Sequence, residues 1–334
     1  MKEAYLYKKR AGKLVECALC NRRCKIPAGA RGNCGVRMNQ GGKLYAMTYA
    51  KPCSIAVDPI EKKPFFHFLP GTESLSIATV GCNFHCLHCQ NWEISQAAWD
   101  AGPQTEVPPE EIIKLAKKYD TPSISYTYTE PTIFYEYAKD TSALARKAGI
   151  KNTFVTNGYM TKEMLADYKT LDAARVDVKG DERFYREVCG GIEMEHVLQS
   201  IRAMHKKGIW TEVVTLIIPG YNDNEDSVRQ IAEFVKATDA DMPLHFTAFY
   251  PAHKMQNVPA TTRDSLVRAR QLALDIGVHY VYCGNTYAGD PFENTFCPKC
   301  GELVIKRGGF TVAENRLTKG NKCPHCSTKI ALVA

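Results

Sequence analysis

Short apolar runs alternate with helical patterns through the middle of the chain, and this alternation is the strongest constraint on its fold. Seven runs rich in apolar and β-branched residues lie at 75–80, 123–128, 152–156, 174–179, 211–218, 244–250 and 278–283. Strands that alternate with helices form right-handed βαβ units and a parallel sheet. Six or seven units are fewer than the eight of a closed barrel. We therefore expect an α/β fold, a partial (open) β/α barrel of six or seven units, with its site at the carboxyl ends of the strands.

The segments between these runs carry helix signals. Residues 108–120 begin with prolines and acidic residues, as the first turn of a helix does. Residues 194–208 place apolar side chains on one face and end in Gly208, which suits a C-terminal cap. Residues 224–237 show the same periodicity. All three segments are predicted helices.

The composition is that of an ordinary globular protein, with 45% hydrophobic and 24% charged residues. Residues 1–17 contain no apolar stretch suited to a secretion signal. The longest clearly apolar run, Val213 to Ile218, is too short to span a membrane. We expect a cytoplasmic protein with no membrane partner.

Fourteen cysteines in a chain of this kind favour metal binding over disulfides. Eleven of them form three groups: Cys17, Cys20, Cys24 and Cys34; Cys82, Cys86 and Cys89; and Cys297, Cys300, Cys323 and Cys326. The grouping suggests three parts. We expect a metal-binding extension and lead-in over 1–72, the barrel over 73–290, and a ribbon over 291–334.

The two outer groups resemble closed metal sites. The last consists of two Cys-x-x-Cys knuckles separated by 22 residues, which gives tetrahedral sulfur ligation for zinc in a ribbon or iron in a rubredoxin-like site. We favour structural zinc there. The first group has Gly29, Gly32 and Gly35 for tight turns. Zinc is also our first expectation for it, with an auxiliary iron–sulfur cluster as the alternative.

The net charge of +7 is concentrated at the two ends. Residues 1–40 contain ten Lys and Arg against two acids, and residues 297–334 contain seven against two. Thiolates around a divalent ion leave a negative charge that nearby cations offset, so metal binding accounts for the asymmetry. An acidic partner such as RNA is the alternative, although neither end interleaves aromatic residues as an RNA platform does.

The middle group is incomplete as a closed site. Cys82, Cys86 and Cys89 follow the run 75–80 through Gly81, and the next cysteine is Cys189. A 4Fe–4S cube held by three thiolates has one iron without a protein ligand. Such an iron can bind a small molecule, and a strand-to-helix loop places it at the catalytic face.

This trio and the motifs after it resemble the radical S-adenosylmethionine superfamily. The motifs "GCNFHCLHCQNWEIS", "YTEPT", "VTNGY", "DVKG" and "FTAFYP" fall in order at successive strand ends. Within the superfamily, the chain looks like the radical enzyme of the AmmeMemoRadiSam group, which is related to pyruvate formate-lyase activating enzymes. "VDPIEKKPFFHFLPG" and "CNRRCKIPAGARGNCGVR" carry that likeness, which covers residues 15–290.

The resemblance implies that the amino and carboxylate groups of S-adenosylmethionine chelate the open iron. An electron from the reduced cluster then yields methionine and a 5′-deoxyadenosyl radical, which abstracts hydrogen from a substrate. The electron implies a flavodoxin or ferredoxin partner, and the subgroup implies AMMECR1-domain and Memo-like partners. As an alternative, the activating-enzyme likeness implies abstraction from a glycine of a large enzyme. An RNA-modifying radical enzyme and a non-enzymatic iron–sulfur and zinc module are weaker alternatives.

The resemblance also implies cofactor contacts. Carried over by position, they are Asn91, Thr129, Glu130, Asn157, Asp177, Lys179, His88 and His245. Glu130 would pair with the ammonium of the cofactor and Lys179 with its carboxylate. His88 holds the position of an aromatic residue beside the adenine, and His245 is either an adenosine contact or a buried core histidine.

The sequence departs from the family at one turn. Tyr128 and Thr129 replace two glycines, a change that bears on how closely the main chain approaches the cofactor. The two metal-binding ends could help to shield the site, because a radical must be kept from water. We expect these ends to serve as lids or docking surfaces.

Overall fold

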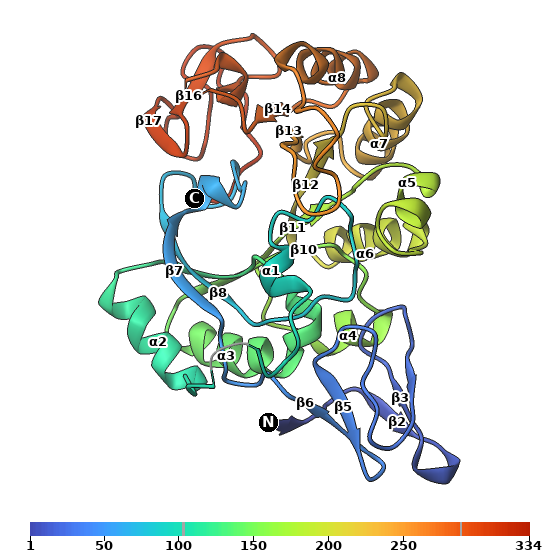
Figure 1. Ribbon diagram of the computed structural model, residues 1–334. Coiled ribbons are helices and arrows are strands. Elements are labelled where there is room, and N and C mark those ends of the chain that lie inside the picture. The colour runs from blue at the N-terminus through green and yellow to red at the C-terminus, as the bar shows by residue number, and fades with distance from the viewer. Residues whose placement is uncertain (102–103, 288) are drawn as a thin grey trace.

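A computed structural model describes residues 1–101, 104–287 and 289–334, and its centre is an eight-stranded sheet (Figure 1). In spatial order its strands are β14 (Val281–Gly284), β13 (Leu244–Ala248), β12 (Trp210–Ile217), β11 (Ala173–Asp177), β10 (Lys151–Thr156), β9 (Ser123–Tyr126), β8 (Glu73–Ala78) and β7 (Ser54–Pro59). Strands β8 to β14 are parallel, and each pairs with the next along the chain. The seven predicted runs are confirmed as these strands. β7, which was not predicted, pairs antiparallel with β8.

Helices connect the parallel strands and, apart from the short helix at Trp92–Ser95, which lies within the curve of the sheet, they follow its outer side (Figure 1). They are α1 (Trp92–Ser95), α2 (Pro109–Lys118), α3 (Tyr135–Lys147), α4 (Lys162–Asp167), α5 (Glu182–Glu187), α6 (Met194–Lys206), α7 (Glu225–Thr238) and α8 (Arg263–Ile276), with short 3-10 turns η1 (Ala11–Lys13), η2 (Ile60–Lys62), η3 (Pro131–Phe134) and η4 (Pro291–Glu293). The three predicted helices are α2, α6 and α7.

Helix α7 shows why the sequence folds as it does. The Asn224 side chain accepts a hydrogen bond from the backbone N–H of Ser227, at 2.9 Å, and caps the first turn. Glu225 and Asp226 follow, where acidic residues suit the helix dipole. The face that carries Val228, Ile231, Ala232 and Val235 is buried in the main hydrophobic core.

Small antiparallel sheets lie at the two ends of the molecule. The N-terminal strands are β1 (Lys2–Glu3), β2 (Tyr7–Lys9), β3 (Val15–Cys17), β4 (Lys25–Ile26), β5 (Arg37–Gln40) and β6 (Lys43–Ala46), and the C-terminal strands are β15 (Thr295–Phe296), β16 (Leu303–Gly308) and β17 (Thr311–Asn315). Figure 1 shows β2 to β6 near α4, and β16 and β17 at the opposite end, near β14. The predicted domain boundaries at 72 and 290 stay predictions.

Buried polar contacts attach the C-terminal sheet to the main one. Arg307 of β16 is 2% exposed, and its Nη2 donates to the carbonyl of Phe66 at 2.7 Å. His67 lies next to Phe66, with its Nδ1 2.5 Å from the carbonyl of Ala331 and its Nε2 2.5 Å from the hydroxyl of Tyr282. Because these groups are buried and paired, they fix the C-terminal sheet against β14.

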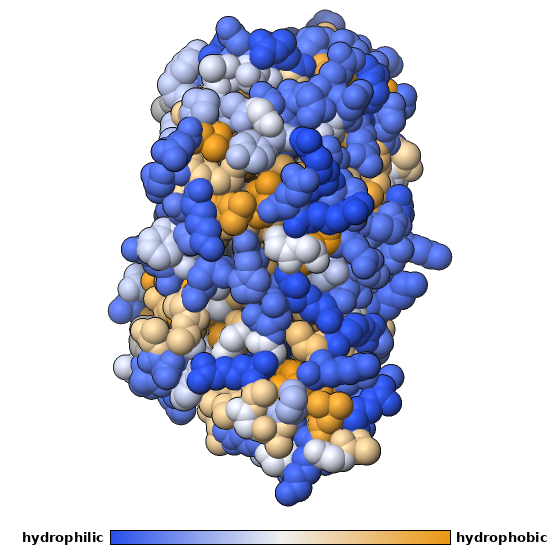
Figure 2. Space-filling model, turned by 45° about the vertical axis from the view of Figure 1, so that its right-hand side comes forward, coloured by the Kyte–Doolittle hydropathy of each residue, from blue (hydrophilic) through white to orange (hydrophobic). Residues whose placement is uncertain are grey.

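In the described residues, no helix has both the length and the apolar character that crossing a bilayer requires. Figure 2 shows a mostly hydrophilic face interrupted by separate hydrophobic patches.

Candidate functional site

A cavity of about 330 Å³ lies at the carboxyl ends of the parallel strands. Its lining includes the cysteine trio and all eight predicted cofactor contacts: Cys82, Cys86, Cys89, His88, Asn91, Thr129, Glu130, Asn157, Asp177, Lys179 and His245. These residues come from the loops after β8, β9, β10 and β11, and from two strands themselves, because Asp177 ends β11 and His245 lies in β13. The fold therefore brings together residues that lie up to 163 positions apart in the sequence.

The trio lies on the loop between β8 and α1. The backbone N–H of Phe84 donates to the Cys82 sulfur at 3.4 Å, and the Ser95 hydroxyl lies 3.2 Å from the Cys89 sulfur. Hydrogen bonds of this kind stabilise thiolate ligands and tune a bound cluster. Gly81 precedes the trio at φ +98°, and a Cβ there would lie 2.6 Å from Val36 Cγ1. Glycine is needed at this point because the N-terminal region packs directly against the loop.

The spacing of the trio fits a cluster of several irons. Within the described parts of the chain, only the C-terminal four cysteines bring three or more potential ligand atoms of Cys, His, Asp or Glu within 4.8 Å of one another. The trio's sulfurs are therefore spread more widely around the cavity. A multi-iron cube separates its thiolates more than a single ion does, so three sulfurs facing an open cavity fit a 4Fe–4S cluster with one iron left free.

Glu130 is the centre of a buried polar network on one side of the cavity. Its Oε1 accepts hydrogen bonds from the hydroxyl of Thr156 at 2.7 Å and from the backbone N–H of Thr132 at 3.0 Å. Its Oε2 accepts one from the backbone N–H of Asn157 at 2.7 Å. Burial raises the pKa of Glu130, and these donors oppose that rise. Oε2 retains a free lone pair, so the carboxylate can accept a further hydrogen bond from a ligand.

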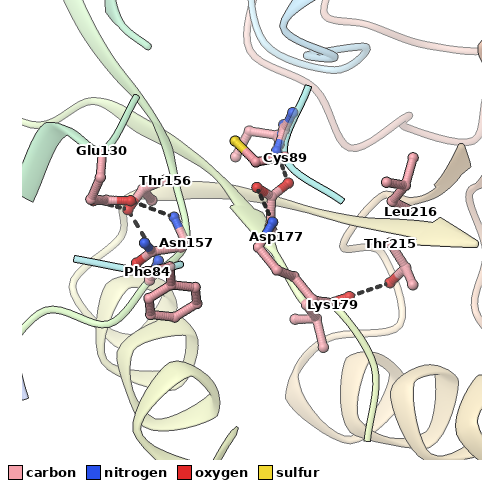
Figure 3. A network of polar contacts seen from close by, with 12 residues as sticks. Phe84, Cys89, Glu130, Thr156, Asn157, Asp177, Lys179, Thr215 and Leu216 are labelled. Atoms are coloured by element: carbon pink, nitrogen blue, oxygen red, sulfur yellow. Dashed lines mark hydrogen bonds and ion pairs between the residues drawn. The ribbon is translucent and has the colours of Figure 1, made fainter. Parts of the chain in front are cut away.

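Asn157 connects this network to the cluster loop. Its Nδ2 donates to Asn83 Oδ1 at 2.8 Å and lies 3.9 Å from the Cys82 sulfur. Figure 3 shows Asn157 beside Glu130 and Thr156 on one side of the view, and Asp177 with Lys179 on the other.

The Asp177 carboxylate lies between two cations. Lys179 Nζ is 3.0 Å from Asp177 Oδ2, and Arg175 Nη1 pairs with Oδ1. Burial alone would raise the pKa of Asp177, but the two cations outweigh burial and lower it. Burial likewise opposes the charge on Lys179, yet the Asp177 carboxylate raises the pKa of the lysine. The pair therefore stays charged, and Lys179 presents a fixed positive charge to the cavity.

Tyr128 keeps the backbone conformation that a glycine would have at its position. Its φ is +64°, in the left-handed region. Its hydroxyl bonds to Asp58 Oδ2, and Lys63 Nζ lies 4.4 Å from the centre of its ring. These contacts hold a strained residue in place. The left-handed conformation that glycine adopts most easily is therefore present at Tyr128 although the residue is not glycine.

Two other predicted contacts connect loops around the cavity. Asn91 Nδ2 donates to the carbonyl of Tyr128 at 2.9 Å, and the Thr129 hydroxyl donates to the carbonyl of Thr79 at 2.7 Å. Both bonds hold the turn after β9 against the cluster loop and the end of β8. The two side chains therefore position backbone groups around the cavity.

The two predicted histidines differ in their surroundings. His88 is 4% exposed, and its Nδ1 is buried without a hydrogen-bond partner in the described part of the chain. Burial lowers the pKa of His88 to about 3, so the ring is neutral and available to a ligand. His245 Nε2 lies 2.8 Å from Glu212 Oε2, and its ring stacks on Tyr282. His245 thus lines the cavity as a buried, paired histidine.

Lys63 and Arg175 line the cavity, and neither they nor Asp58, which pairs with Lys63, had a role in the sequence predictions. Asp58 accepts bonds from Lys62 and Lys63 at 2.7 and 2.6 Å. Burial lowers the pKa of Lys63 to about 8. Arg175 Nε donates to the carbonyl of Lys63 at 2.8 Å and so extends the network to β11. The stretch "VDPIEKKPFFHFLPG" was the signal that could have pointed to Asp58 and Lys63.

The C-terminal cysteines form a compact set. The sulfurs of Cys297 and Cys326 lie 3.6 Å apart, and those of Cys300 and Cys323 lie 3.7 Å apart. Tetrahedral ligation with Zn–S bonds of about 2.3 Å separates sulfurs by about 3.8 Å. The set can hold one metal ion. The predicted N-terminal four, Cys17, Cys20, Cys24 and Cys34, line a separate cavity and do not gather within 4.8 Å.

A parallel sheet with a three-cysteine loop after its first parallel strand defines an α/β protein with a site for a metal cluster. The model of the radical SAM superfamily matches residues 76–235. An uncharacterized protein of Methanocaldococcus jannaschii is 47% identical over 335 residues, which cover all of both chains.

Two further relatives carry functional names. A protein of the same organism, provisionally named as a glycyl-radical enzyme activating enzyme, is 23% identical over 61% of this chain and 78% of its own length. The pyruvate formate-lyase-activating enzyme of Staphylococcus aureus is 23% identical over 48% of this chain and 68% of its own. The chain belongs to the radical SAM superfamily and is an enzyme of that type.

Proposed function

We propose that this enzyme binds a 4Fe–4S cluster through Cys82, Cys86 and Cys89, and S-adenosylmethionine at the iron that the protein leaves open. When bound, the cluster and S-adenosylmethionine together supply a 5′-deoxyadenosyl radical that removes a hydrogen atom from a substrate. The observation that carries the proposal is the convergence of the trio, the Glu130 network and the Lys179–Asp177 pair on one cavity. On this view the curved sheet serves as the partial barrel of the superfamily.

The charges of the cavity match the two ends of an amino acid. Glu130 offers a buried carboxylate with a free lone pair, which suits the ammonium of S-adenosylmethionine. Lys179 offers a cation fixed by Asp177, which suits the carboxylate. The neutral His88 ring, with its unpartnered Nδ1, suits the adenine. An electron carrier would not need such a set of contacts, so they favour an enzyme over a non-enzymatic iron–sulfur module.

The substrate side of the cavity has a different character. Val155, Val214 and Leu216 line it, together with the paired His245. Phe310 of the C-terminal module reaches the same cavity and is 47% exposed. An apolar wall limits the access of water to a reactive radical, and an exposed aromatic group at the rim suits a partner.

We further propose zinc in the C-terminal module, a flavodoxin or ferredoxin as the electron donor, and a cytoplasmic setting. AMMECR1-domain and Memo-like proteins are the proposed partners. A second candidate is the activation of a glycyl-radical enzyme, which the names of two relatives favour. A glycyl radical signal in a co-expressed partner would support that candidate. RNA that co-purifies and dissociates steeply with salt would instead support an RNA-modifying enzyme.

Electron paramagnetic resonance of the reduced, reconstituted protein tests the proposed cofactor site. We expect the cluster spectrum to change when S-adenosylmethionine is added, because its amino and carboxylate groups would enter the coordination of the open iron. The same addition to Cys86→Ala should produce no such change. A wild-type spectrum that does not respond would contradict the proposal.

A further inference from the structure

The four N-terminal cysteines surround a small enclosed cavity apart from the main site. Cys17 ends β3, Cys20 and Cys24 lie on the turn that leads to β4, and Cys34 lies just before β5. All four line the cavity, whose remaining walls include Leu19, Ile26 and Ile133. Elements far apart in the sequence thus close an apolar chamber around four thiols.

The separation of these sulfurs does not suit a single zinc ion. The C-terminal set shows the compact arrangement of a mononuclear site, with sulfur pairs at 3.6 and 3.7 Å. In the described chain, no three of the N-terminal sulfurs lie within 4.8 Å of one another, and neither do the three sulfurs of the trio at the main cavity. A multi-iron cube, whose thiolates stand at its corners, takes a wider set of sulfurs than a single ion does.

Two buried hydrogen-bond donors line this cavity without a partner. Arg37 is 2% exposed and Asn83 is 1% exposed, and both contribute to the wall. Arg37 Nε and Asn83 Nδ2 are buried and make no hydrogen bond with any residue that the structure describes. Leaving such buried donors without an acceptor is energetically unfavourable. Sulfides and thiolates of a cluster accept N–H hydrogen bonds, so a cluster in the chamber would give both donors an acceptor.

The rest of Arg37 is held by Glu136. Its Nη1 and Nη2 donate to the two carboxylate oxygens of Glu136 at 2.7 and 2.8 Å. This pair is internally neutral and fixes the guanidinium, which leaves Nε as the group on the chamber wall. The surplus of Lys and Arg in residues 1–40 suits the negative charge of an all-thiolate cluster.

We propose that Cys17, Cys20, Cys24 and Cys34 bind a second 4Fe–4S cluster. Four cysteines occupy all four irons, so this cluster has no open iron and would carry single electrons rather than bind a substrate. The N-terminal region, for which zinc was our first expectation, is on this view a redox module. Its electrons would come from a low-potential one-electron donor.

The second site adjoins the first. A Cβ on Gly81 would lie 2.9 Å from the carbonyl oxygen of Cys34, so the two cysteine loops are in contact. Asn83 follows Cys82 directly, and its Oδ1 accepts from Asn157 while its Nδ2 remains for the N-terminal chamber. An electron that reaches the second cluster therefore has a short route through packed protein to the trio.

Metal analysis of full-length variants tests the proposal. We expect the anaerobically reconstituted wild-type chain to contain about eight irons and eight sulfides, as two such cubes require. A variant with Cys82, Cys86 and Cys89 all changed to Ala should retain about four irons and the Mössbauer spectrum of a 4Fe–4S cluster. This readout leaves the N-terminal site intact, so it does not depend on a folding-sensitive substitution there. Iron near zero in this variant, or two zinc ions per wild-type chain, would overturn the proposal.

A complementary variant removes the second site alone. Cys24→Ala with Cys34→Ala should lower the iron content to about four per chain, while the spectral response to S-adenosylmethionine at the trio persists. In the background that lacks the trio, Asn83→Asp should make the midpoint potential of the remaining cluster more negative, because an acceptor replaces the N–H donor. An unchanged potential would contradict the placement of Asn83 at the cluster.

Discussion

Single side chains of the cavity carry the interactions that the proposed function needs. Lys179 is the clearest case, because Asp177 fixes it while its charge faces the cavity. A charge-assisted hydrogen bond contributes about 1.5–3 kcal/mol, which corresponds to roughly tenfold to hundredfold in affinity. We therefore predict that Lys179→Met weakens S-adenosylmethionine binding by about that factor, as measured by anaerobic calorimetry.

The matched control for this prediction is Lys147→Met, which removes an exposed lysine of α3. It should leave both the affinity and the iron content unchanged. An affinity of Lys179→Met within twofold of the wild type, at full iron content, would show that the lysine does not bind the cofactor.

The buried Arg37–Glu136 pair makes a stability prediction at the same scale. The two side chains are 2% and 0% exposed. Removing one partner of a buried pair leaves an uncompensated charge and costs about 3–5 kcal/mol. Glu136→Gln should lower the free energy of unfolding by about that amount in denaturant titrations. Glu16→Gln, which breaks the more exposed pair with Arg10, should cost about 0–1 kcal/mol. Equal costs for the two variants would refute this account of the core.

Among the elements, the contact between the segment that follows β17 and strand β14 depends on a neutral histidine. His67 lies between the Ala331 carbonyl and the Tyr282 hydroxyl. One ring nitrogen must donate to the carbonyl, and the other can then accept from the hydroxyl. Burial lowers the pKa of His67 to about 4. The unfolded chain, with a histidine pKa of about 6.5, therefore binds more protons between those values, and stability falls as the pH drops through that window.

We predict that His67→Gln makes the loss of stability on acidification shallower. The wild type should lose up to about 1.4 kcal/mol per pH unit through this group. The measurement is the melting temperature from pH 7.5 to 5.5. His279→Gln, at an exposed histidine, should reproduce the wild-type slope. A wild-type slope in His67→Gln would mean that the ring does not titrate as described.

The C-terminal module should affect the substrate side more than the cofactor side. Its Phe310 and Glu293 line the cavity, whereas the trio and Lys179 come from the main sheet and its loops. We predict that Cys326→Ser abolishes zinc binding and lowers the melting temperature, yet leaves S-adenosylmethionine affinity within about twofold. Metal analysis and calorimetry check this. A parallel loss of zinc and of cofactor affinity would contradict the separation of the two roles.

The elements also show what could be predicted from the sequence. The strands β8 to β14 were predicted because buried parallel strands have nearly continuous apolar runs in their sequences. β7 was missed because its residues are mostly half-exposed and include Asp58 and Pro59. The N-terminal strands are two to four residues long, too short for a period to show.

The site was predictable where motifs stand at strand ends, and not where it depends on pairing between strands. Glu130, Asn157 and Lys179 follow strands that the pattern revealed. Asp58 meets the cavity residues Lys63 and Tyr128 because β7 pairs with β8, where Ser76 donates to it at 2.8 Å. Contacts of this kind depend on register, which the local pattern of a single strand does not give.

At the scale of the whole molecule, the two charged ends and the central cavity form one arrangement. The N-terminal cysteine region packs against the trio's loop, and the C-terminal module reaches the cavity from the opposite end (Figure 1). With the two proposed roles, this arrangement would place a route for electrons on one side of the cluster and a cover for the substrate on the other. The enzyme activity that we propose depends on S-adenosylmethionine binding at the iron that the trio leaves open.

The most direct test is the formation of 5′-deoxyadenosine. The protein would be reconstituted with iron and sulfide under anaerobic conditions and given S-adenosylmethionine and a strong reductant. We predict 5′-deoxyadenosine and methionine as products in the wild type and neither in Cys86→Ala. The absence of product from a wild-type protein with full iron content, and with S-adenosylmethionine bound, would contradict the account.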